Sequence, residues 1–215
     1  MSAENTPPLC LFGAGGHGRV VGAIAARIWP ADVVFGDGSR PLGSLVDGIP
    51  VGVSDLSDLG EHHVIVTVGN TAARRKLQTR AEELGLSCTY LIADPVGYFA
   101  QAPGAGSMIL TAAVVNPGAR IGRGVIVNTA AVVEHDCVIG DFCHLAPNSV
   151  VLGDCTLGDD VWLGANATVV QGVSICSNVT IGAGAVVTRD ITEPGTYVGA
   201  PARKINDTSA LTPSP

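Results

Sequence analysis

The sequence is poor in aromatic residues and has no long apolar run. Phe, Tyr and Trp make up 4% of its 215 residues, so aliphatic side chains must fill most of the interior. No apolar stretch is long enough to span a bilayer. Residues 1–8 lack the basic start and apolar core of a secretory signal peptide. We therefore expect a soluble, cytoplasmic protein that does not insert into a membrane.

Positive charge is also scarce. Twelve Lys and Arg residues face nineteen Asp and Glu residues, which gives a net charge of −7 and argues against a nucleic-acid-binding surface. The six cysteines show no metal-type CxxC spacing, and we expect no disulfide framework. Cys10 lies in an apolar run. Cys137, Cys143 and Cys155 fall at small positions of the repeat described next, which predicts buried, reduced thiols.

A six-residue repeat occupies the second half of the chain. Every sixth position is a branched aliphatic residue, namely Ile109, Val115, Ile121, Val127, Val133, Ile139, Leu145, Val151, Leu157, Leu163, Val169, Ile175, Ile181 and Val187. A small or short side chain usually follows four residues later. Neither a helix nor an alternating strand has this period. It indicates a parallel β-helix, in which stacked short strands share one continuous core.

The first part of the chain alternates strand and helix patterns. Strands are expected over 9–12, 32–35, 63–68 and 87–92, and helices over 19–29 and 71–84. This order predicts an α/β domain with a small Rossmann-like parallel sheet. We expect this domain over 1–100, with the boundary near 94–106, a β-helix over 101–205 and a disordered tail over 206–215.

A glycine-rich loop, Gly13-x-Gly15-x-x-Gly18, lies between the first strand and the first helix. With Asp37 after the next strand it fits a dinucleotide fingerprint, and glycines before a helix N-terminus suit any nucleoside diphosphate. The domain is short for an NAD fold, the second domain has no hydride-transfer site, and His17 is unusual in such a loop. A nucleotide sugar is therefore favoured over NAD or a purely structural turn.

His135 is flanked by Glu134 and Asp136. A carboxylate bonded to one ring nitrogen fixes the tautomer and makes the other nitrogen more basic, so His135 is a candidate general base. The alternative is a surface histidine beside solvated acids. The residues alone do not decide between these two, nor which acid is the partner.

His144 lies half a coil further on. It cannot stack on His135 within one chain, but the two could face one groove between subunits. Some related prisms hold a catalytic metal with three histidines. Here only two of the five histidines lie in the repeat, since His17, His62 and His63 precede it, so we expect no metal.

Four motifs together resemble one family. They are the GAGGHG loop, the VGN strand end, EHDCVIGDFCHLAP within the repeat and YVGAPAR at its close. The chain resembles, over about 9–205, the sialic-acid O-acetyltransferase-like and nucleotide 4-amino-sugar N-acetyltransferase family of hexapeptide-repeat acyltransferases. The resemblance implies a left-handed prism with three hexads per coil, and a homotrimer with active sites between subunits.

The resemblance also implies roles for individual residues. His135 would be the general base, Asp136 the acid that orients it, and the Gly153 amide the oxyanion donor. The acetyl-CoA site would comprise His144, Gly153, Ala165 and Ala183. The substrate site would comprise Gly15, Gly16, His17, Asp37 and Gly69.

The expected reaction moves an acetyl group from acetyl-CoA to the 4-amino group of a nucleotide-linked 4-amino-4,6-dideoxy sugar. GDP-perosamine is the favoured acceptor and a UDP-linked 4-amino sugar the next. The amine attacks directly, and Cys137 and Cys143 are not expected to act as nucleophiles. The alternatives are O-acetylation of a sialic-acid-type sugar and a noncatalytic β-helix scaffold.

Overall fold

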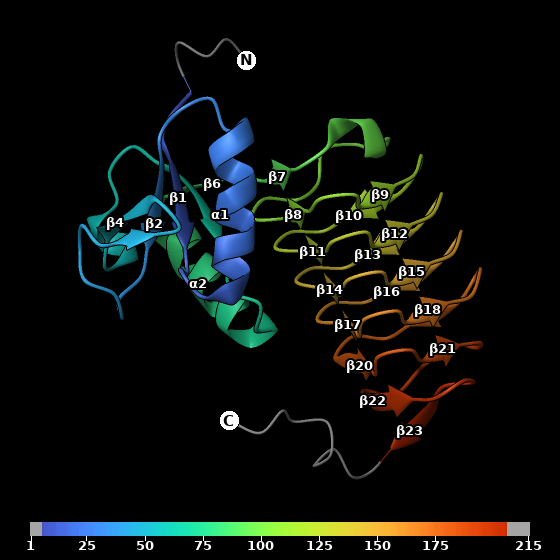
Figure 1. Cartoon of the computed structure of the whole chain (residues 1–215). Coiled ribbons are helices and arrows are strands. Elements are labelled where there is room, and N and C mark those ends of the chain that lie inside the picture. The colour runs from blue at the N-terminus through green and yellow to red at the C-terminus, as the bar shows by residue number, and fades with distance from the viewer. Residues whose placement is uncertain (1–5, 206–215) are drawn as a thin grey trace.

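The structure, a computed structural model, describes residues 6–205. An N-terminal α/β part lies along one side of a tall stack of short strands (Figure 1). The N-terminal sheet has the order β3-β4-β2-β1-β5-β6. Its strands and the two long helices are β1 Leu9–Phe12, α1 Gly16–Ile28, β2 Val33–Gly36, β3 Leu45–Val46, β4 Ile49–Val53, β5 His63–Val66, α2 Thr71–Glu83 and β6 Ser87–Cys88. Short 3₁₀ turns span Leu56–Asp58 and Pro95–Gly97.

The two helices cover opposite faces of this sheet. Alternate residues of a strand point to opposite faces, and β1 divides its side chains in this way. Leu9 and Leu11 share a core with Val21 of α1, whereas Cys10 and Phe12 share another with Ala81 of α2. Neighbouring strands of this sheet pair in parallel, except that β3 and β4 pair with each other antiparallel. The predicted α/β domain with its parallel sheet is confirmed.

Two local expectations were wrong. Between β2 and β5, where no strand was expected, the chain forms the β3–β4 hairpin, whose turn residues Asp47 and Gly48 both have positive φ. Asp-Gly is a strong signal for such a turn. The single strand expected over 87–92 is two strands. β6 pairs with β5, while β7 (Leu91–Ile92) pairs with β8 (Met108–Ile109), the first strand of the repeat region. The chain therefore changes sheets before the expected boundary.

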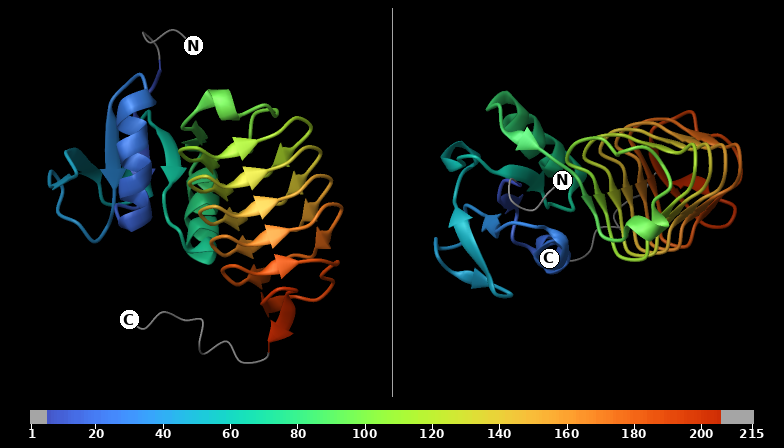
Figure 2. Two further views of the ribbon diagram at one scale, coloured as in Figure 1. Left: turned by 45° about the vertical axis from the view of Figure 1, so that its right-hand side comes forward. Right: turned by 90° about the horizontal axis from the view of Figure 1, so that it is seen from above.

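The second part is a triangular prism built mainly from two-residue strands (Figure 2). Face 1 comprises β8 Met108–Ile109, β11 Ile126–Val127, β14 His144–Leu145, β17 Trp162–Leu163 and β20 Val179–Ile181. Face 2 comprises β9 Val114–Val115, β12 Val132–Val133, β15 Val150–Val151, β18 Thr168–Val169 and β21 Val186–Val187. Face 3 comprises β10 Arg120–Ile121, β13 Val138–Ile139, β16 Thr156–Leu157 and β19 Ser174–Ile175. Face 1 continues into β22 Gly195–Val198 and β23 Arg203–Ile205.

Each coil repeats after 18 residues, as the pairing of Ile121 with Ile139 and of Ile139 with Leu157 shows. The predicted aliphatic positions all point inward and form one buried column. Cys137, Cys143 and Cys155 lie in this column as free thiols, which confirms their predicted burial. The corners between strands need residues with positive φ, such as Asp136. Asn and Asp tolerate this conformation better than other residues with a side chain.

A buried arginine ties the two parts together. The Arg74 side chain is fully buried, and its guanidinium donates to the carbonyl oxygens of Val68 and Gly69 in its own domain. It also donates to those of Gly124 (2.8 Å) and Phe142 (2.9 Å) in the prism. No helix in the described part of the chain is long and apolar enough to cross a membrane.

Candidate functional site

The outer glycines of the loop after β1 are explained by packing. Gly13 has φ +118°, and a Cβ there would lie 2.8 Å from the Val68 side chain. A Cβ on Gly18 would collide with the carbonyl oxygen of Gly13. These two glycines therefore let helix α1 approach the sheet closely, as any fold with this turn requires.

Packing does not explain Gly15 and Gly16. A Cβ at either position would meet nothing within 4 Å, and neither has positive φ. Gly15 is the N-cap of α1 and supplies no side-chain cap, so the first amides of the helix are open to a ligand. A helix N-terminus carries positive potential and free N–H groups, which suits a phosphate.

Asp37 closes this loop from the end of β2. Its carboxylate accepts hydrogen bonds from the Ala14 N–H (2.9 Å) and from the N–H and hydroxyl of Ser39 (2.9 and 2.6 Å). Burial raises the pKa of Asp37, but the hydrogen bonds from Ser39 and Ala14 outweigh it and leave the pKa below its ordinary value. The carboxylate is charged at neutral pH and helps to fix the loop.

Three rings link the glycine loop to face 1 of the prism. The ring centroids of His17 and His144 are 6.2 Å apart, and those of His144 and Trp162 are 6.3 Å apart. The Asn128 side-chain oxygen accepts from the Thr129 N–H, so its NH₂ group faces His144 and donates to Nε2 (3.1 Å). His144 therefore carries its proton on Nδ1, which has no partner among the described residues.

Both histidines are neutral at physiological pH. Burial, followed by the charge of Arg74, lowers the pKa of His17 to about 4. Burial, followed by the charges of Arg74 and His17, lowers the pKa of His144 to about 3. Neither ring can supply positive charge to a ligand near pH 7. Each can accept or donate a hydrogen bond as a neutral group.

These depressed pKa values predict acid sensitivity. The unfolded chain binds protons near pH 6.5 and the folded chain does not, so stability is full above pH 6.5 and falls as the pH drops towards the folded values. At pH 5, each of the two histidines should have lowered the free energy of unfolding by about 2 kcal/mol. Between pH 7.5 and pH 5, the free energy of unfolding should therefore fall by about 2 kcal/mol less in His144→Asn than in the wild type. Urea unfolding at fixed protein concentration would measure both values. An equal loss in the variant and the wild type would contradict this.

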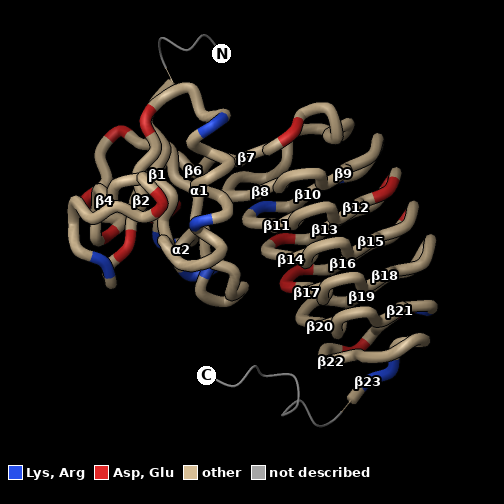
Figure 3. The backbone as a smooth tube through the Cα atoms, in the orientation of Figure 1, with Lys and Arg blue, Asp and Glu red and all other residues tan. Residues whose placement is uncertain are grey.

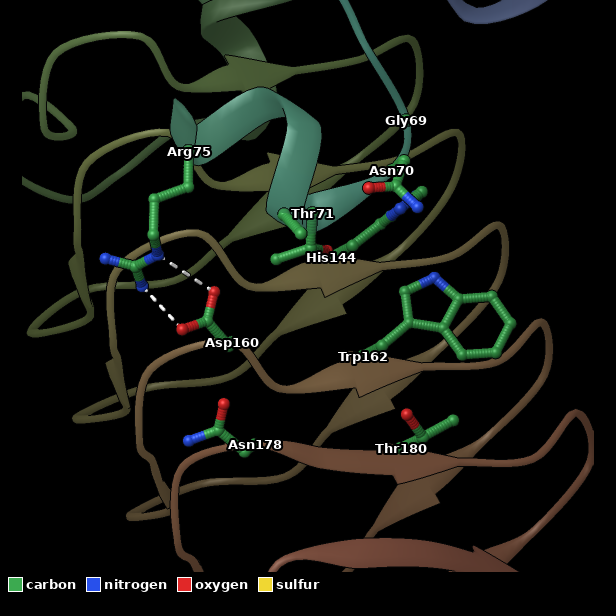
Figure 4. Close-up of a pocket in the computed structure, with 10 residues that line it drawn as sticks. Gly69, Asn70, Thr71, Arg75, His144, Asp160, Trp162, Asn178 and Thr180 are labelled. Carbon is green, nitrogen blue, oxygen red and sulfur yellow. Dashed lines mark hydrogen bonds and ion pairs between the residues drawn. The ribbon is translucent and has the colours of Figure 1, made fainter. Parts of the chain in front are cut away.

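A groove of about 730 Å³ opens beside these rings (Figure 4). It is lined by Gly69, Asn70, Thr71, Ala72, Arg75, His144, Asp160, Trp162, Asn178 and Thr180. Asn70 caps α2 by accepting from the Ala73 N–H, and Arg75 forms a two-point ion pair with Asp160. Sequence reasoning missed Trp162, although a Trp directly before an inward leucine must point outward and is therefore a detectable signal.

The second cluster lies at the corner between faces 2 and 3. His135 Nδ1–H donates to the Asp136 carboxylate (2.9 Å), and both side chains are more than half exposed. This hydrogen bond, reinforced by the charges of Asp136, Glu134 and Asp154, raises the pKa of His135 above its ordinary value. Figure 3 shows the acidic residues on the loop that follows β12. Asp136, rather than Glu134, bonds to the ring.

Gly153 lies directly beside the other ring nitrogen. A Cβ on Gly153 would be 2.6 Å from His135 Nε2. Any residue other than glycine at 153 would therefore displace the His135 ring. Its backbone N–H makes no hydrogen bond within residues 6–205. The corner therefore presents a basic ring nitrogen and a free amide donor side by side.

The predicted site residues thus fall into groups on different parts of one chain. Gly15, Gly16, His17, Gly69 and His144 gather where the N-terminal part meets face 1, and Asp37 lies at the same loop. His135, Asp136 and Gly153 gather at the corner between faces 2 and 3. Ala165 and Ala183 follow β17 and β20, at the corner between faces 1 and 2. Within residues 6–205, no group of three or more His, Cys, Asp or Glu side chains could hold a metal ion.

The prism and the N-terminal part of the chain each match a known family. Residues 119–153 and 154–189 match the bacterial transferase hexapeptide family (six repeats), and residues 8–81 match the PglD N-terminal domain. The chain matches no curated protein sequence.

Solved structures cover nearly the whole chain. The acetyltransferase domain of PglB from Neisseria gonorrhoeae, in complex with acetyl coenzyme A, is 35% identical, with a TM-score of 0.82 over 94% of this chain and 100% of that one. PerB from Caulobacter crescentus, in complex with CoA and GDP-perosamine, is 30% identical, with a TM-score of 0.80 over 93% and 97%. WeeI from Acinetobacter baumannii is 26% identical, with a TM-score of 0.79 over 92% and 99%.

The chain belongs to the family of acetyl-CoA-dependent sugar acetyltransferases that join a PglD-type N-terminal domain to a left-handed parallel β-helix.

Proposed function

We propose that this protein transfers an acetyl group from acetyl-CoA to the 4-amino group of a nucleotide-linked 4-amino-4,6-dideoxy sugar. The observation that carries the proposal is the hydrogen-bonded pair of His135 and Asp136 beside the free amide of Gly153. GDP-perosamine is the favoured acceptor, because PerB, which was solved with CoA and that sugar, aligns over 93% of this chain. A UDP-linked 4-amino sugar is the next candidate.

His135 acts as the general base in this mechanism. Asp136 accepts a hydrogen bond from Nδ1–H and so keeps Nε2 free to take a proton from the attacking amine. Such general-base help is typically worth about 10²–10⁴-fold in rate. The new N–C bond makes the thioester carbon tetrahedral, and the Gly153 N–H donates to the oxygen that becomes negative. The C–S bond then breaks, and the imidazolium returns its proton to the CoA thiolate. No acyl-enzyme forms.

The acceptor binds at the glycine loop. Its diphosphate lies at the open N-terminus of α1, against Gly15 and Gly16, where the free amides and helix potential favour negative charge. His17 and Gly69 flank the sugar side. Asp37, whose carboxylate already holds the loop, lies on the nucleoside side.

The donor binds along the prism. His144 lines the groove beside the glycine loop and contacts the acetyl group or the pantetheine arm. Gly153, Ala165 and Ala183 line the path of coenzyme A with small side chains. Because acetyl-CoA and nucleotide sugars are metabolites of the cell interior, we place the reaction in the cytoplasm.

The proposed assembly is a homotrimer with sites between subunits. The outward residues of face 2 form a mainly apolar column of four valines and one threonine, comprising Val114, Val132, Val150, Thr168 and Val186. An apolar sheet face of this kind is suited to burial against another copy. Packing prisms side by side would let the His135 corner of one subunit meet the His144 groove of the next, which one chain cannot do by itself. Light scattering should give the mass of three chains.

Replacing Gly15 with Leu should raise the KM for the nucleotide sugar by about 10-fold or more, because the side chain occupies the space for the diphosphate. The KM for acetyl-CoA should not change. The fold should tolerate the change, since a Cβ at Gly15 meets nothing within 4 Å. Gly60 is equally open and precedes β5 at the other end of the sheet, so Gly60→Leu is the matched control. Equal rises in both KM values would contradict separate binding sites.

An acceptor panel distinguishes the proposed reaction from its alternatives. Initial rates of free-thiol release from acetyl-CoA would be measured with GDP-linked and UDP-linked 4-amino sugars and with sialic acid. We expect the highest kcat/KM with a nucleotide-linked amino sugar. Preference for sialic acid would indicate O-acetylation, and no thiol release with any acceptor would indicate a noncatalytic scaffold.

A further inference from the structure

The corner that carries His135 is one of a series of equivalent corners. Gly118, Asp136, Asp154 and Gly172 occupy the same place in four successive coils, 18 residues apart, and all have positive φ, at 80°, 60°, 65° and 74°. The Asp136 N–H donates to the carbonyl of Pro117, and the same bond recurs in the coils that follow. The backbone at these four positions is therefore alike, and they differ in what surrounds them.

The two glycines of this series meet different neighbours. A Cβ on Gly118 would overlap Oδ1 of Asp136 and would lie 3.2 Å from its Cγ and 3.3 Å from its backbone N. A Cβ on Gly172 would meet nothing within 4 Å. Positive φ alone explains a glycine at either place. Only at Gly118 does the missing side chain also leave room for a specific functional group.

The group that fills the space above Gly118 is the Asp136 carboxylate, which is hydrogen-bonded to His135. Oδ2 of Asp136 accepts from His135 Nδ1–H at 2.9 Å, while Oδ1 lies over Gly118. On the other side, Gly153 leaves room for the ring itself. The His135–Asp136 pair thus lies between Gly118, one coil before Asp136, and Gly153, one coil after His135.

We propose that Gly118 is a positioning residue for the acetyl transfer, because its lack of a side chain sets the place of the Asp136 carboxylate and thereby orients His135. This inference rests on the proposed function of His135. A methyl group at 118 would displace the end of a flexible, exposed side chain, so the prism can keep its fold. The carboxylate would move away from Nδ1.

The charged groups around His135 fix the sign of the expected pH effect. Asp136 and Glu134 lie on its own corner, Asp154 lies on the next coil, and all three raise its pKa, with the Asp136 hydrogen bond as the largest cause. A base must be unprotonated to work, so the rate rises as the pH passes through the pKa of His135. A weaker bond to Asp136 should move that midpoint to lower pH.

The test compares Gly118→Ala with Gly172→Ala. Both variants place a methyl group on the same backbone with similar φ, so both carry the same corner strain. Gly118→Ala should lower kcat by about 10–100-fold, as expected when a catalytic group is misplaced by about 1 Å. Its KM values should stay near the wild-type values, and its pH–rate midpoint should fall. Gly172→Ala should leave kcat, the KM values and the pH–rate midpoint unchanged. Equal losses of kcat in the two variants would overturn the proposal.

A double-mutant cycle tests whether Gly118 acts through Asp136. In an Asp136→Ala background there is no carboxylate to displace, so adding Gly118→Ala should change kcat by less than about 2-fold. A further loss as large as in the wild-type background would refute the proposed route.

Histidine NMR separates this inference from the proposed function. The ring resonances of His135 can be assigned from their absence in His135→Ala, and their titration needs no substrate. The midpoint should fall in Gly118→Ala and match the wild type in Gly172→Ala. An unchanged midpoint in Gly118→Ala would refute the positioning role, even if acetyl transfer is observed. A wild type without acetyl transfer would refute the proposed function, while the titration still tests the contact.

Discussion

Replacing His135 with Ala should lower kcat by about 10²–10⁴-fold, the usual contribution of a general base. The ring is more than half exposed, and it packs over the backbone of Gly153 rather than in a core. Its removal should therefore leave the proposed trimer and the thermal stability of the protein intact. The measurement is kcat and KM for both substrates at pH 7.5, together with light scattering.

A second histidine serves as the control for this variant. His62 lies before β5, away from both clusters, so His62→Ala should retain wild-type kinetics. If His135→Ala also retained near-normal turnover at neutral pH, His135 could not be the base. A loss confined to the KM for either substrate would assign it to binding instead.

Replacing Arg74 with Met should destabilise the protein by about 3–5 kcal/mol. Burial, opposed in part by nearby Cys143 and Asp160, lowers the pKa of Arg74 only to about 10, so the group is charged at neutral pH. Met would fill much of its volume but would leave buried carbonyls in both parts of the chain without a donor, including those of Gly124 and Phe142. Urea unfolding followed by circular dichroism would measure the loss.

The neighbouring arginine provides the control. Arg75 lies next in the same helix, and its ion pair with Asp160 is partly exposed. Its guanidinium also lies over the ring of Phe142. Such surface pairs usually contribute about 0–1 kcal/mol, so Arg75→Met should destabilise only slightly. Equal losses in the two variants would contradict the role assigned to Arg74.

The prism could be predicted from the sequence because its repeat is strict. A branched aliphatic residue at every sixth position has one structural solution, and the structure buries each of these residues in one column. The same repeat predicted that Cys137, Cys143 and Cys155 are buried in this column. The N-terminal order of strands and helices was also readable, apart from the β3–β4 hairpin and the split of 87–92.

The site could be predicted only in pieces. The contact between His135 and Asp136 is local, so neighbouring residues suggested it. The contact between His17 and His144 depends on how two domains dock, and the residues that fix that docking, led by Arg74, carry no local signature. The tautomer of His144 depends on Asn128, one coil away. The role of Gly118 emerges only when stacked coils are compared.

The product of a single reaction tests the central claim most directly. The protein would be incubated with acetyl-CoA and GDP-perosamine, and the sugar product analysed by mass spectrometry and NMR. The proposed mechanism predicts one added acetyl group, bound as an amide at N4, with one equivalent of free CoA released. An acetyl ester on a sugar hydroxyl, or CoA release without sugar acetylation, would contradict it.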